Sequence, residues 1–188
     1  MTPEQVYSPA EDSDLLLRAA LREVRPTDRV LEVGTGSGYV AEGVMGLAAS
    51  VVATDINPHA VATARARGVD AVRTDLIRGL SGPFDLILFN PPYLPTLPAE
   101  RMDDWLEYAL DGGPTGRVVI ERFVAEAGRV LPDLGRILLL VSSLTDPDAV
   151  RELFAGQGFV SFIVDTEAIG GETLYVIRAM RDLCRMRG

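Results

Sequence analysis

The sequence predicts an α/β fold built on a seven-stranded, mostly parallel sheet, with helices on both faces and one antiparallel strand. Three observations lead to this prediction. Short apolar runs alternate with longer helical segments along most of the chain, as in a parallel sheet with crossover helices. A Gly-rich turn separates the first of these runs from the next helix. Gly170 and Gly171 join the last two runs, as in an antiparallel hairpin.

Each strand is expected where a short apolar run is bounded by turn residues, and each helix where capping residues precede a longer amphipathic segment. Strands are predicted at residues 29–33, 51–55, 70–73, 84–89, 136–141, 159–165 and 173–177. After the first helix, further helices are predicted at residues 39–47, 57–67, 118–131 and 146–156.

The first helix is expected to begin with Ser8 as its N-cap and Pro9 as its first residue. Glu11 and Asp12 would then complement the positive end of the helix dipole. Capping accounts for these acidic residues. The alternative is that residues 9–13 also form a short helical lid over a ligand.

Length and composition favour a single domain that spans residues 1–188, since a chain of this length can bury one large core. Cys184 is the only cysteine, which excludes an intramolecular disulfide and a cysteine-based zinc site. The net charge is −9 and there is no lysine, so non-specific binding to nucleic acid should be weak. No apolar run is long enough for a membrane span, and the first residues do not resemble a signal peptide. A cytoplasmic location is therefore expected.

The turn after the first predicted strand has features of a nucleotide-binding loop. Its glycines alternate as Gly34, Gly36 and Gly38, whereas a dinucleotide fingerprint would place its last glycine where Tyr39 stands. Glu32 precedes the glycines, and a carboxylate there would repel a pyrophosphate but attract a cation. The loop therefore favours a positively charged or amine-bearing ligand such as S-adenosyl-L-methionine.

Two further carboxylates end neighbouring strands. Asp55 follows the glycines by roughly 20 residues, the spacing typical of a carboxylate that binds ribose hydroxyls. Asp75 follows the third predicted strand and could accept the amino hydrogens of an adenine. Its alternative role is that of an ordinary turn residue.

The segment Asn90-Pro91-Pro92-Tyr93 ends the central predicted strand, at the sheet edge where ligands bind in α/β proteins. The two prolines stop the strand and lack backbone donors, which leaves carbonyl acceptors. The Asn90 side chain adds a further carbonyl, and Tyr93 adds a flat ring. The segment therefore suits a planar amide or amino group held by its N–H bonds, although a simple proline-rich turn has the same residue types.

Taken together, these motifs resemble class I methyltransferases, and in particular the HemK-type protein glutamine methyltransferases. The resemblance extends through Tyr7 to Ser13, Gly112 to Gly116 and Gly170 to Leu174, and is closest to the archaeal and eukaryotic branch, which lacks an extra N-terminal helical domain. It implies methylation of the Gln in the Gly-Gly-Gln loop of a class I translation release factor, and a small zinc-binding activator as partner in a heterodimer. No metal is implied in the site.

The resemblance and the residue chemistry together divide the candidate site in two. The expected catalytic residues are Asn90, Pro91, Pro92 and Tyr93. The expected cofactor-binding residues are Ser13, Glu32, Gly34, Gly36, Asp55, Asp75, Leu76 and Asn90.

The predicted strand at residues 70–73 is expected at a sheet edge, where a partner chain could add a strand. We therefore expect the activator to dock there.

Three other functions remain open at this point. Methyltransferases that act on the exocyclic amine of adenine or guanine share the Asn-Pro-Pro-Tyr segment, because that amine presents the same planar N–H2 group. The negative charge and the lack of room for a target-recognition domain disfavour this function. A non-catalytic module that binds S-adenosyl-L-methionine, and an enzyme that methylates lysine, are the weaker alternatives.

Overall fold

The computed structural model describes residues 5–96 and 104–185, and in these residues seven strands form one sheet. The strands are β1 (Arg29–Val33), β2 (Ser50–Asp55), β3 (Asp70–Arg73), β4 (Leu86–Phe89), β5 (Arg136–Ser142), β6 (Phe159–Ile169) and β7 (Glu172–Arg181). Their order in the sheet is β3-β2-β1-β4-β5-β7-β6. Strands β3, β2, β1, β4 and β5 are parallel, and β7 runs antiparallel to both β5 and β6. The predicted sheet is therefore confirmed, with β3 at one edge.

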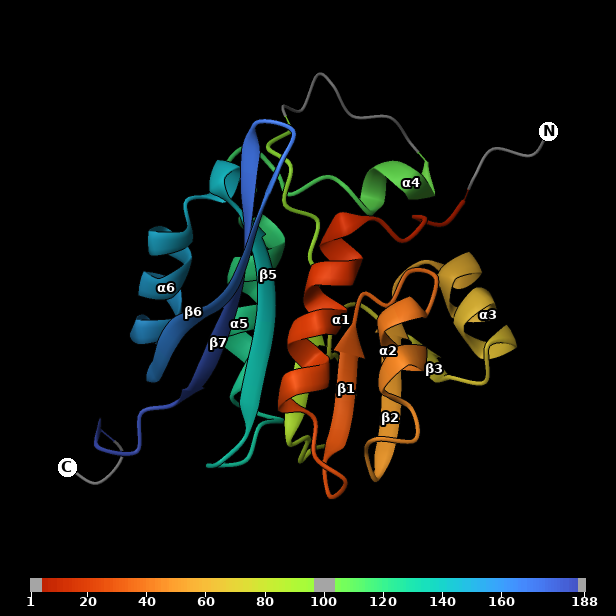
Figure 1. Ribbon diagram of the computed structural model, residues 1–188, viewed down its shortest axis with the longest axis horizontal. Helices are drawn as coiled ribbons and strands as arrows, with labels where there is room; N and C mark the ends of the chain where they lie inside the picture. Colours follow the sequence, from red (N-terminus) through yellow and green to blue (C-terminus); the bar gives the residue numbers. More distant parts are fainter. Residues whose placement is uncertain (1–4, 97–103, 186–188) are drawn as a thin grey trace.

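Helices cover both faces of this sheet (Figure 1). They are α1 (Glu11–Glu23), α2 (Tyr39–Val44), α3 (Pro58–Ala66), the short α4 (Trp105–Tyr108), α5 (Val118–Ala127) and α6 (Pro147–Gly156). Helices α1, α2 and α3 pack on one face, and α5 and α6 pack on the other. Among the described residues, none of the helices has both the length and the apolar character required to cross a membrane.

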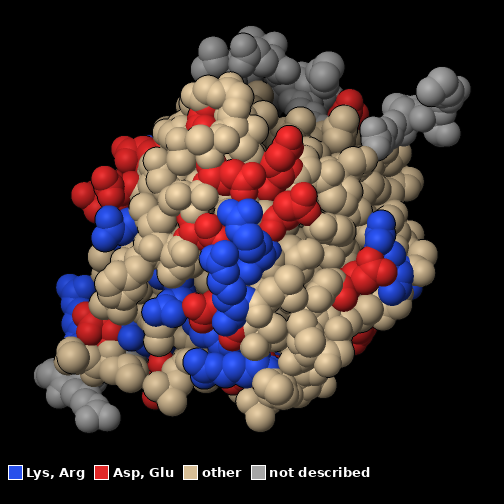
Figure 2. All heavy atoms as spheres, viewed as in Figure 1, with Lys and Arg blue, Asp and Glu red and all other residues tan. Residues whose placement is uncertain are grey.

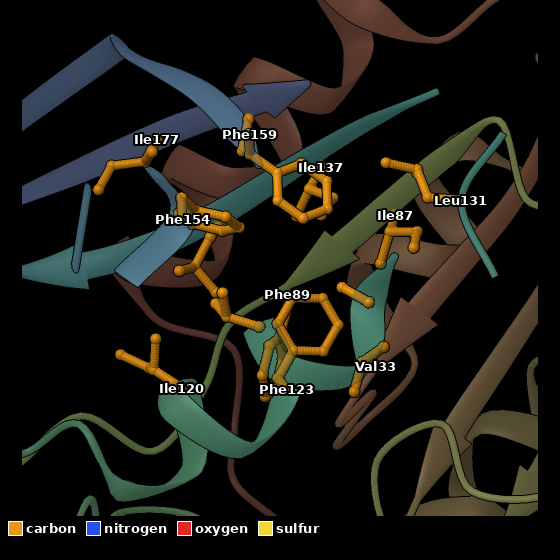
Figure 3. Close-up of a cluster of buried hydrophobic side chains, with 14 of the residues drawn as sticks. Val33, Ile87, Phe89, Ile120, Phe123, Leu131, Ile137, Phe154, Phe159 and Ile177 are labelled. Atoms are coloured by element: carbon orange, nitrogen blue, oxygen red, sulfur yellow. The ribbon is translucent and has the colours of Figure 1, made fainter. Parts of the chain in front are cut away.

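The core divides into two layers because side chains alternate between the faces of each strand. The layer under α5 and α6 contains Phe89 and Phe123, whose rings meet edge to face with centroids 4.9 Å apart (Figure 3). The strand residues of the opposite layer, under α1 and α2, are Val30, Leu86, Leu88, Leu138, Leu140, Leu174 and Val176. Both faces of the central strands are thus apolar, as the continuous apolar runs in the sequence predict.

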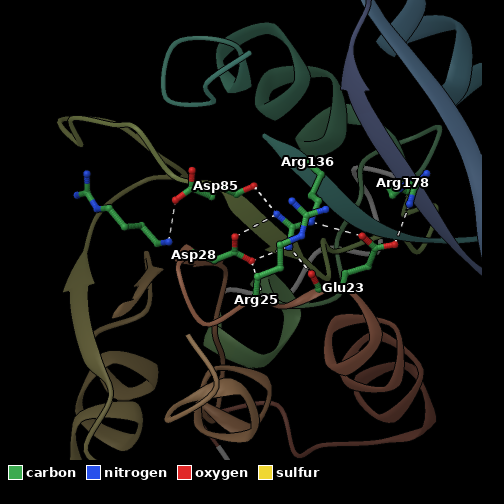
Figure 4. Close-up of polar contacts among 7 residues, drawn as sticks. Glu23, Arg25, Asp28, Asp85, Arg136 and Arg178 are labelled. Carbon is green, nitrogen blue, oxygen red and sulfur yellow. Dashed lines mark hydrogen bonds and ion pairs between the residues drawn. The ribbon is translucent and has the colours of Figure 1, made fainter. Parts of the chain in front are cut away.

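A buried ionic cluster lies at the amino ends of the parallel strands (Figure 4). Arg136, at the start of β5, is 2% exposed and lies 2.5 Å from the carboxylate of Asp28, which is 3% exposed. Glu23 at the end of α1 lies 3.4 Å from Arg136 and 2.9 Å from Arg178 on β7. The cluster joins α1, the residue before β1, and strands β5 and β7 at this end of the sheet.

The prediction for the first helix was wrong at its start. The helix begins at Glu11 with Ala10 as N-cap, and Ala10 makes no side-chain capping bond. Instead, Asp12 accepts the backbone N–H of Ser13 at 2.6 Å. Ser8 and Pro9 precede the helix, so they do not perform the capping roles expected of them.

The final hairpin is confirmed, with Gly170 (φ +52°) and Gly171 (φ +100°) at its turn, but both strands are longer than predicted. Strand β7 continues through Arg178 and Arg181, whose charges interrupt the apolar pattern. These charges are satisfied by distant groups, since Arg178 pairs with Glu23 and Arg181 donates to the Leu131 carbonyl at 2.9 Å. Other boundaries differ by a few residues, notably α2 and α5, which end earlier than expected.

Candidate active site

A pocket opens at the carboxyl ends of the parallel strands, bounded by loops that follow β1, β2, β3 and β4 and by the segment before α1. Every residue that the sequence singled out for the site lines this pocket, and none of them lies elsewhere. They are Ser13, Glu32, Gly34, Gly36, Asp55, Asp75, Leu76, Asn90, Pro91, Pro92 and Tyr93.

The glycine loop after β1 forms the floor of the pocket. Gly34 and Gly36 have positive φ angles of +64° and +53°, which side-chain-bearing residues rarely adopt. A Cβ atom at Gly34 would stand 3.3 Å from the ring of Phe89, so the chain passes close to the end of β4. The Gly36 N–H donates to Asp55 at 2.9 Å. Both glycines line the pocket, and the loop is held against β4 and the end of β2 by these contacts.

Glu32 is a buried carboxylate beside that loop, with 4% of its surface exposed. It accepts hydrogen bonds from the Thr35 hydroxyl and, at 3.1 Å, from the backbone N–H of Ala41. Burial is the main cause that raises the pKa of Glu32 to about 8, and the nearby Asp55 adds to it, while the two hydrogen bonds oppose it. A cation bound next to Glu32 would restore the charge that burial disfavours.

Asp55 and Asp75 are two further carboxylates in the pocket wall, to which Asp12 also belongs. Asp55 also accepts the Asn57 N–H at 2.8 Å, and burial raises its pKa above the usual value despite these hydrogen bonds. Asp75 lies 2.5 Å from the guanidinium of Arg122 on α5. These carboxylates around glycine backbone favour ligands with hydroxyl, amino or sulfonium groups over phosphates.

Asn90 stands where β4 ends, and its side chain is held in one orientation. Its amide NH2 donates to the Asp12 carboxylate at 3.0 Å. Its carbonyl oxygen is buried and has no hydrogen-bond partner among the described residues. An unpaired buried acceptor costs roughly 1–3 kcal/mol, so this one is a candidate to receive a donor from a ligand.

Two tyrosines flank Asn90 in the pocket. The Tyr7 hydroxyl donates to Asp12 at 3.3 Å, and burial together with the Asp12 charge raises the pKa of Tyr7 to about 12. Burial and the charges of Asp12 and Glu172 also raise the pKa of Tyr93 above its ordinary value. Both rings therefore stay neutral at physiological pH, which suits stacking on a planar group.

Several residues that line the pocket are absent from the predicted site, among them Tyr7, Asp12, Trp105 and Arg122. Asp12 was expected only to complement the end of a helix or to belong to a lid. The one signal in the sequence was the Tyr7 to Ser13 segment, which the family resemblance already includes. Nothing local in the sequence marks Trp105 or Arg122.

Comparison with known proteins places the chain in a family. A family model described as the methyltransferase small domain matches residues 4–102. A Methanocaldococcus jannaschii protein assigned as a protein N5-glutamine methyltransferase is 39% identical over 184 residues, covering 94% of this chain and 92% of that protein. The Homo sapiens methyltransferase HEMK2 is 36% identical over 189 residues, covering 92% of this chain and 88% of HEMK2.

Among solved structures, the chain is similar to one in the E. cuniculi Mtq2–Trm112 complex, described as responsible for the methylation of the translation termination factor eRF1. The TM-score is 0.80 at 32% sequence identity, covering 95% of this chain and 99% of that one. The fold, the pocket and these relatives agree: the chain belongs to the methyltransferase small-domain family and, within it, to the HemK-type protein glutamine methyltransferases.

Proposed function

We propose that this protein transfers a methyl group from S-adenosyl-L-methionine to the side-chain amide nitrogen of the Gln in the Gly-Gly-Gln motif of a class I release factor. The observation that carries the proposal is the buried, unpaired carbonyl oxygen of Asn90 at the end of β4. The similarity to the Mtq2–Trm112 complex, which methylates eRF1, supports the choice of substrate.

The pocket residues fit S-adenosyl-L-methionine, which supplies a reactive methyl group on a sulfonium when bound. Gly34 and Gly36 line the pocket without side chains. Glu32 suits the positively charged methionine portion, and Asp55 suits the ribose hydroxyls. Asp75 and Leu76 complete the wall on the side where the adenine would lie.

The acceptor side of the pocket suits an amide. An amide nitrogen is a weak nucleophile because its lone pair is delocalised into the carbonyl group. The Asn90 carbonyl and the Pro91 backbone carbonyl would accept its two hydrogens, hold the nitrogen in line with the methyl group and stabilise charge that develops on it. Pro92 would fix the turn, and Tyr93 would stack on the amide plane. Positioning of this kind contributes about 7 to 11 kcal/mol at best.

The first residues before α1 contribute to the same pocket. Val6, Tyr7 and Pro9 line it together with Asp12 and Ser13. We infer that this segment acts as the lid of a single methyltransferase domain, and closes over the cofactor.

We further propose that the protein works in the cytoplasm as a heterodimer with a small zinc-binding activator. The Mtq2–Trm112 complex supports such a pairing. Strand β3 is at the edge of the sheet, and Val72 on it is 37% exposed. No strand pairs with the outer side of β3 among the described residues, and there the Arg65 side chain donates to the Ala71 carbonyl at 2.9 Å. This edge is the docking site we propose.

The test is methyl transfer from labelled S-adenosyl-L-methionine to a purified class I release factor, with and without a co-expressed small zinc protein. The modified residue is then mapped by mass spectrometry. Label on the Gln of Gly-Gly-Gln is expected. It should disappear with Asn90→Ala and persist with Gln157→Ala, an exposed amide residue after α6.

No label on the release factor, with cofactor binding intact, would contradict the proposal and lead to assays on oligonucleotides. Charge disfavours that outcome, since the chain carries a net charge of −9. On the face seen in Figure 2, acidic and basic side chains lie beside one another and do not form a continuous basic surface.

A further inference from the structure

The Asp12 carboxylate connects the segment before α1 to the end of β4. Its Oδ2 atom accepts the Asn90 amide at 3.0 Å and the Tyr7 hydroxyl at 3.3 Å. Its Oδ1 atom accepts the backbone N–H of Ser13 at 2.6 Å and the Ser13 hydroxyl at 3.2 Å. Asp12 is 5% exposed, so this is a buried charged group with partners on both oxygens.

These contacts determine which way the Asn90 amide faces. A carboxylate only accepts hydrogen bonds, so the NH2 group of Asn90 must lie on the Asp12 side. The Asn90 carbonyl must then face away from Asp12. This is the oxygen that is buried without a partner among the described residues. If the amide were reversed, its carbonyl would face a carboxylate oxygen at 3.0 Å, and two acceptors would repel each other.

We propose that Asp12 is a positioning residue that holds Asn90 with its carbonyl toward the substrate nitrogen. The inference rests on the proposed function and extends it to specificity. With its NH2 group occupied by Asp12, Asn90 presents only an acceptor, so the site selects a nitrogen that carries N–H donors. Tyr7 and Ser13 hold the carboxylate in place, which assigns the Ser13 hydroxyl a role beside Asp12 in addition to any contact with the cofactor.

Asp12→Asn is the informative variant because it keeps the size of the side chain and replaces the acceptor that faces Asn90 and Tyr7 with a donor. The Ser13 N–H requires an acceptor at the Oδ1 position, so the introduced NH2 group must lie at the Oδ2 position, toward Asn90. Asn90 would then turn its carbonyl to this NH2 group and present its own NH2 to the substrate. The NH2 group of Asn90 would then face the NH2 group of the substrate amide, and neither could accept a hydrogen bond from the other. We expect kcat to fall about 100-fold, the loss seen when a reacting group loses one hydrogen bond.

A double variant tests the orientation directly. Asn90→Asp alone sets two carboxylates against each other and should be as impaired as Asp12→Asn. In Asp12→Asn/Asn90→Asp, the donor and acceptor are exchanged across the same contact, and a carboxylate oxygen again faces the substrate. We expect this double variant to exceed both single variants in kcat by about 10-fold or more, since the hydrogen bond and the acceptor are both restored.

The affinity for S-adenosylhomocysteine and the melting temperature should stay close to the parent's in Asp12→Asn. The matched control is Asp148→Asn, which removes an exposed carboxylate from the first turn of α6. Parental kcat in Asp12→Asn, or a double variant no better than the single ones, would overturn the proposal.

A second readout does not depend on the substrate. In the free protein, the side-chain NH2 signal of Asn90 in a ¹H–¹⁵N spectrum should exchange slowly with solvent, and exchange should accelerate in Asp12→Asn. Equal exchange in both proteins would overturn the positioning role. If the parent transfers no label to a release factor, the proposed function fails, and this measurement still decides whether Asp12 orients Asn90.

Discussion

The backbone N–H of Gly36 donates a 2.9 Å hydrogen bond to the Asp55 carboxylate, which joins the glycine loop after β1 to the end of β2. Asp55 thereby shapes the loop and also lines the pocket. We predict that Asp55→Ala weakens binding of S-adenosylhomocysteine by about 10- to 100-fold, since hydrogen bonds to a charged group contribute about 1.5–3 kcal/mol. Isothermal titration calorimetry gives the affinity. Asp148→Ala is the control, and an unchanged dissociation constant for Asp55→Ala would refute the assigned role.

Glu32 should make stability depend on pH. Its pKa is raised from 4.5 to about 8 in the folded protein, so the folded state binds a proton that the unfolded state has lost between these values. The stabilisation that comes from the proton on Glu32 is complete below pH 4.5, and it is lost as the pH rises to about 8. Glu32→Gln cannot ionise at this position. The melting temperature of the variant minus that of the parent should therefore rise between pH 4.5 and about 8 and level off at higher pH. Thermal melts of the cofactor-free proteins test this, and parallel curves would contradict it.

Gly38 should resist substitution for a packing reason as well as a backbone reason. It has φ +81°, and a Cβ atom there would stand 2.9 Å from the Cα of Ala64 on α3. Gly68 has a similar φ of +87°, but a Cβ atom at Gly68 would meet nothing within 4 Å. Gly38→Ala should therefore destabilise the protein by about 1–3 kcal/mol more than Gly68→Ala, as measured by urea denaturation. Equal losses would show that only the backbone angle matters.

The buried Arg136 should contribute more to stability than an exposed arginine. Arg136→Met leaves the carboxylate of Asp28 buried without its cation and should cost about 3–5 kcal/mol. Arg151→Met removes an exposed pair with Asp148 and should change stability by about 0–1 kcal/mol. Chemical denaturation of both variants measures the difference. Similar losses in the two would argue against a structural role for the buried cluster.

The proposed docking of the activator at β3 predicts the behaviour of Asp70→Pro. Asp70 is the first residue of this edge strand, a position where proline is tolerated within a sheet. The variant should keep the parental melting temperature and lose co-purification with the small zinc protein, because proline disrupts strand addition. Retained co-purification at equal stability would exclude this edge as the interface.

The sheet and the floor of the site were predictable because their signals are local. Apolar runs bounded by turns predicted all seven strands. Glu32, the alternating glycines and the Asn90 segment each lie at or directly after the end of a strand, and the carboxyl ends of parallel strands meet at one edge. Their convergence on one pocket followed from topology, without knowledge of any side-chain contact.

The errors arose where distant contacts override local patterns. Strand β7 continues through Arg178 because Glu23, 155 positions away in the chain, pairs with that charge. The first helix starts later than its Ser8 and Pro9 suggest, and Asp12 in its first turn contacts Asn90, 78 positions away in the chain.

By itself, the sequence determined the order of the elements, the ligand edge of the sheet and the residue types available there, because periodicity and turn chemistry act over a few residues. Only the tertiary structure decided what those residues do to one another. Asp12 and Asn90 are 78 positions apart, and Arg122 reaches Asp75 across 47. The direction of the Asn90 amide depends on that first contact. That orientation exists only in the folded protein, where the Asn90 amide nitrogen lies 3.0 Å from the Asp12 carboxylate.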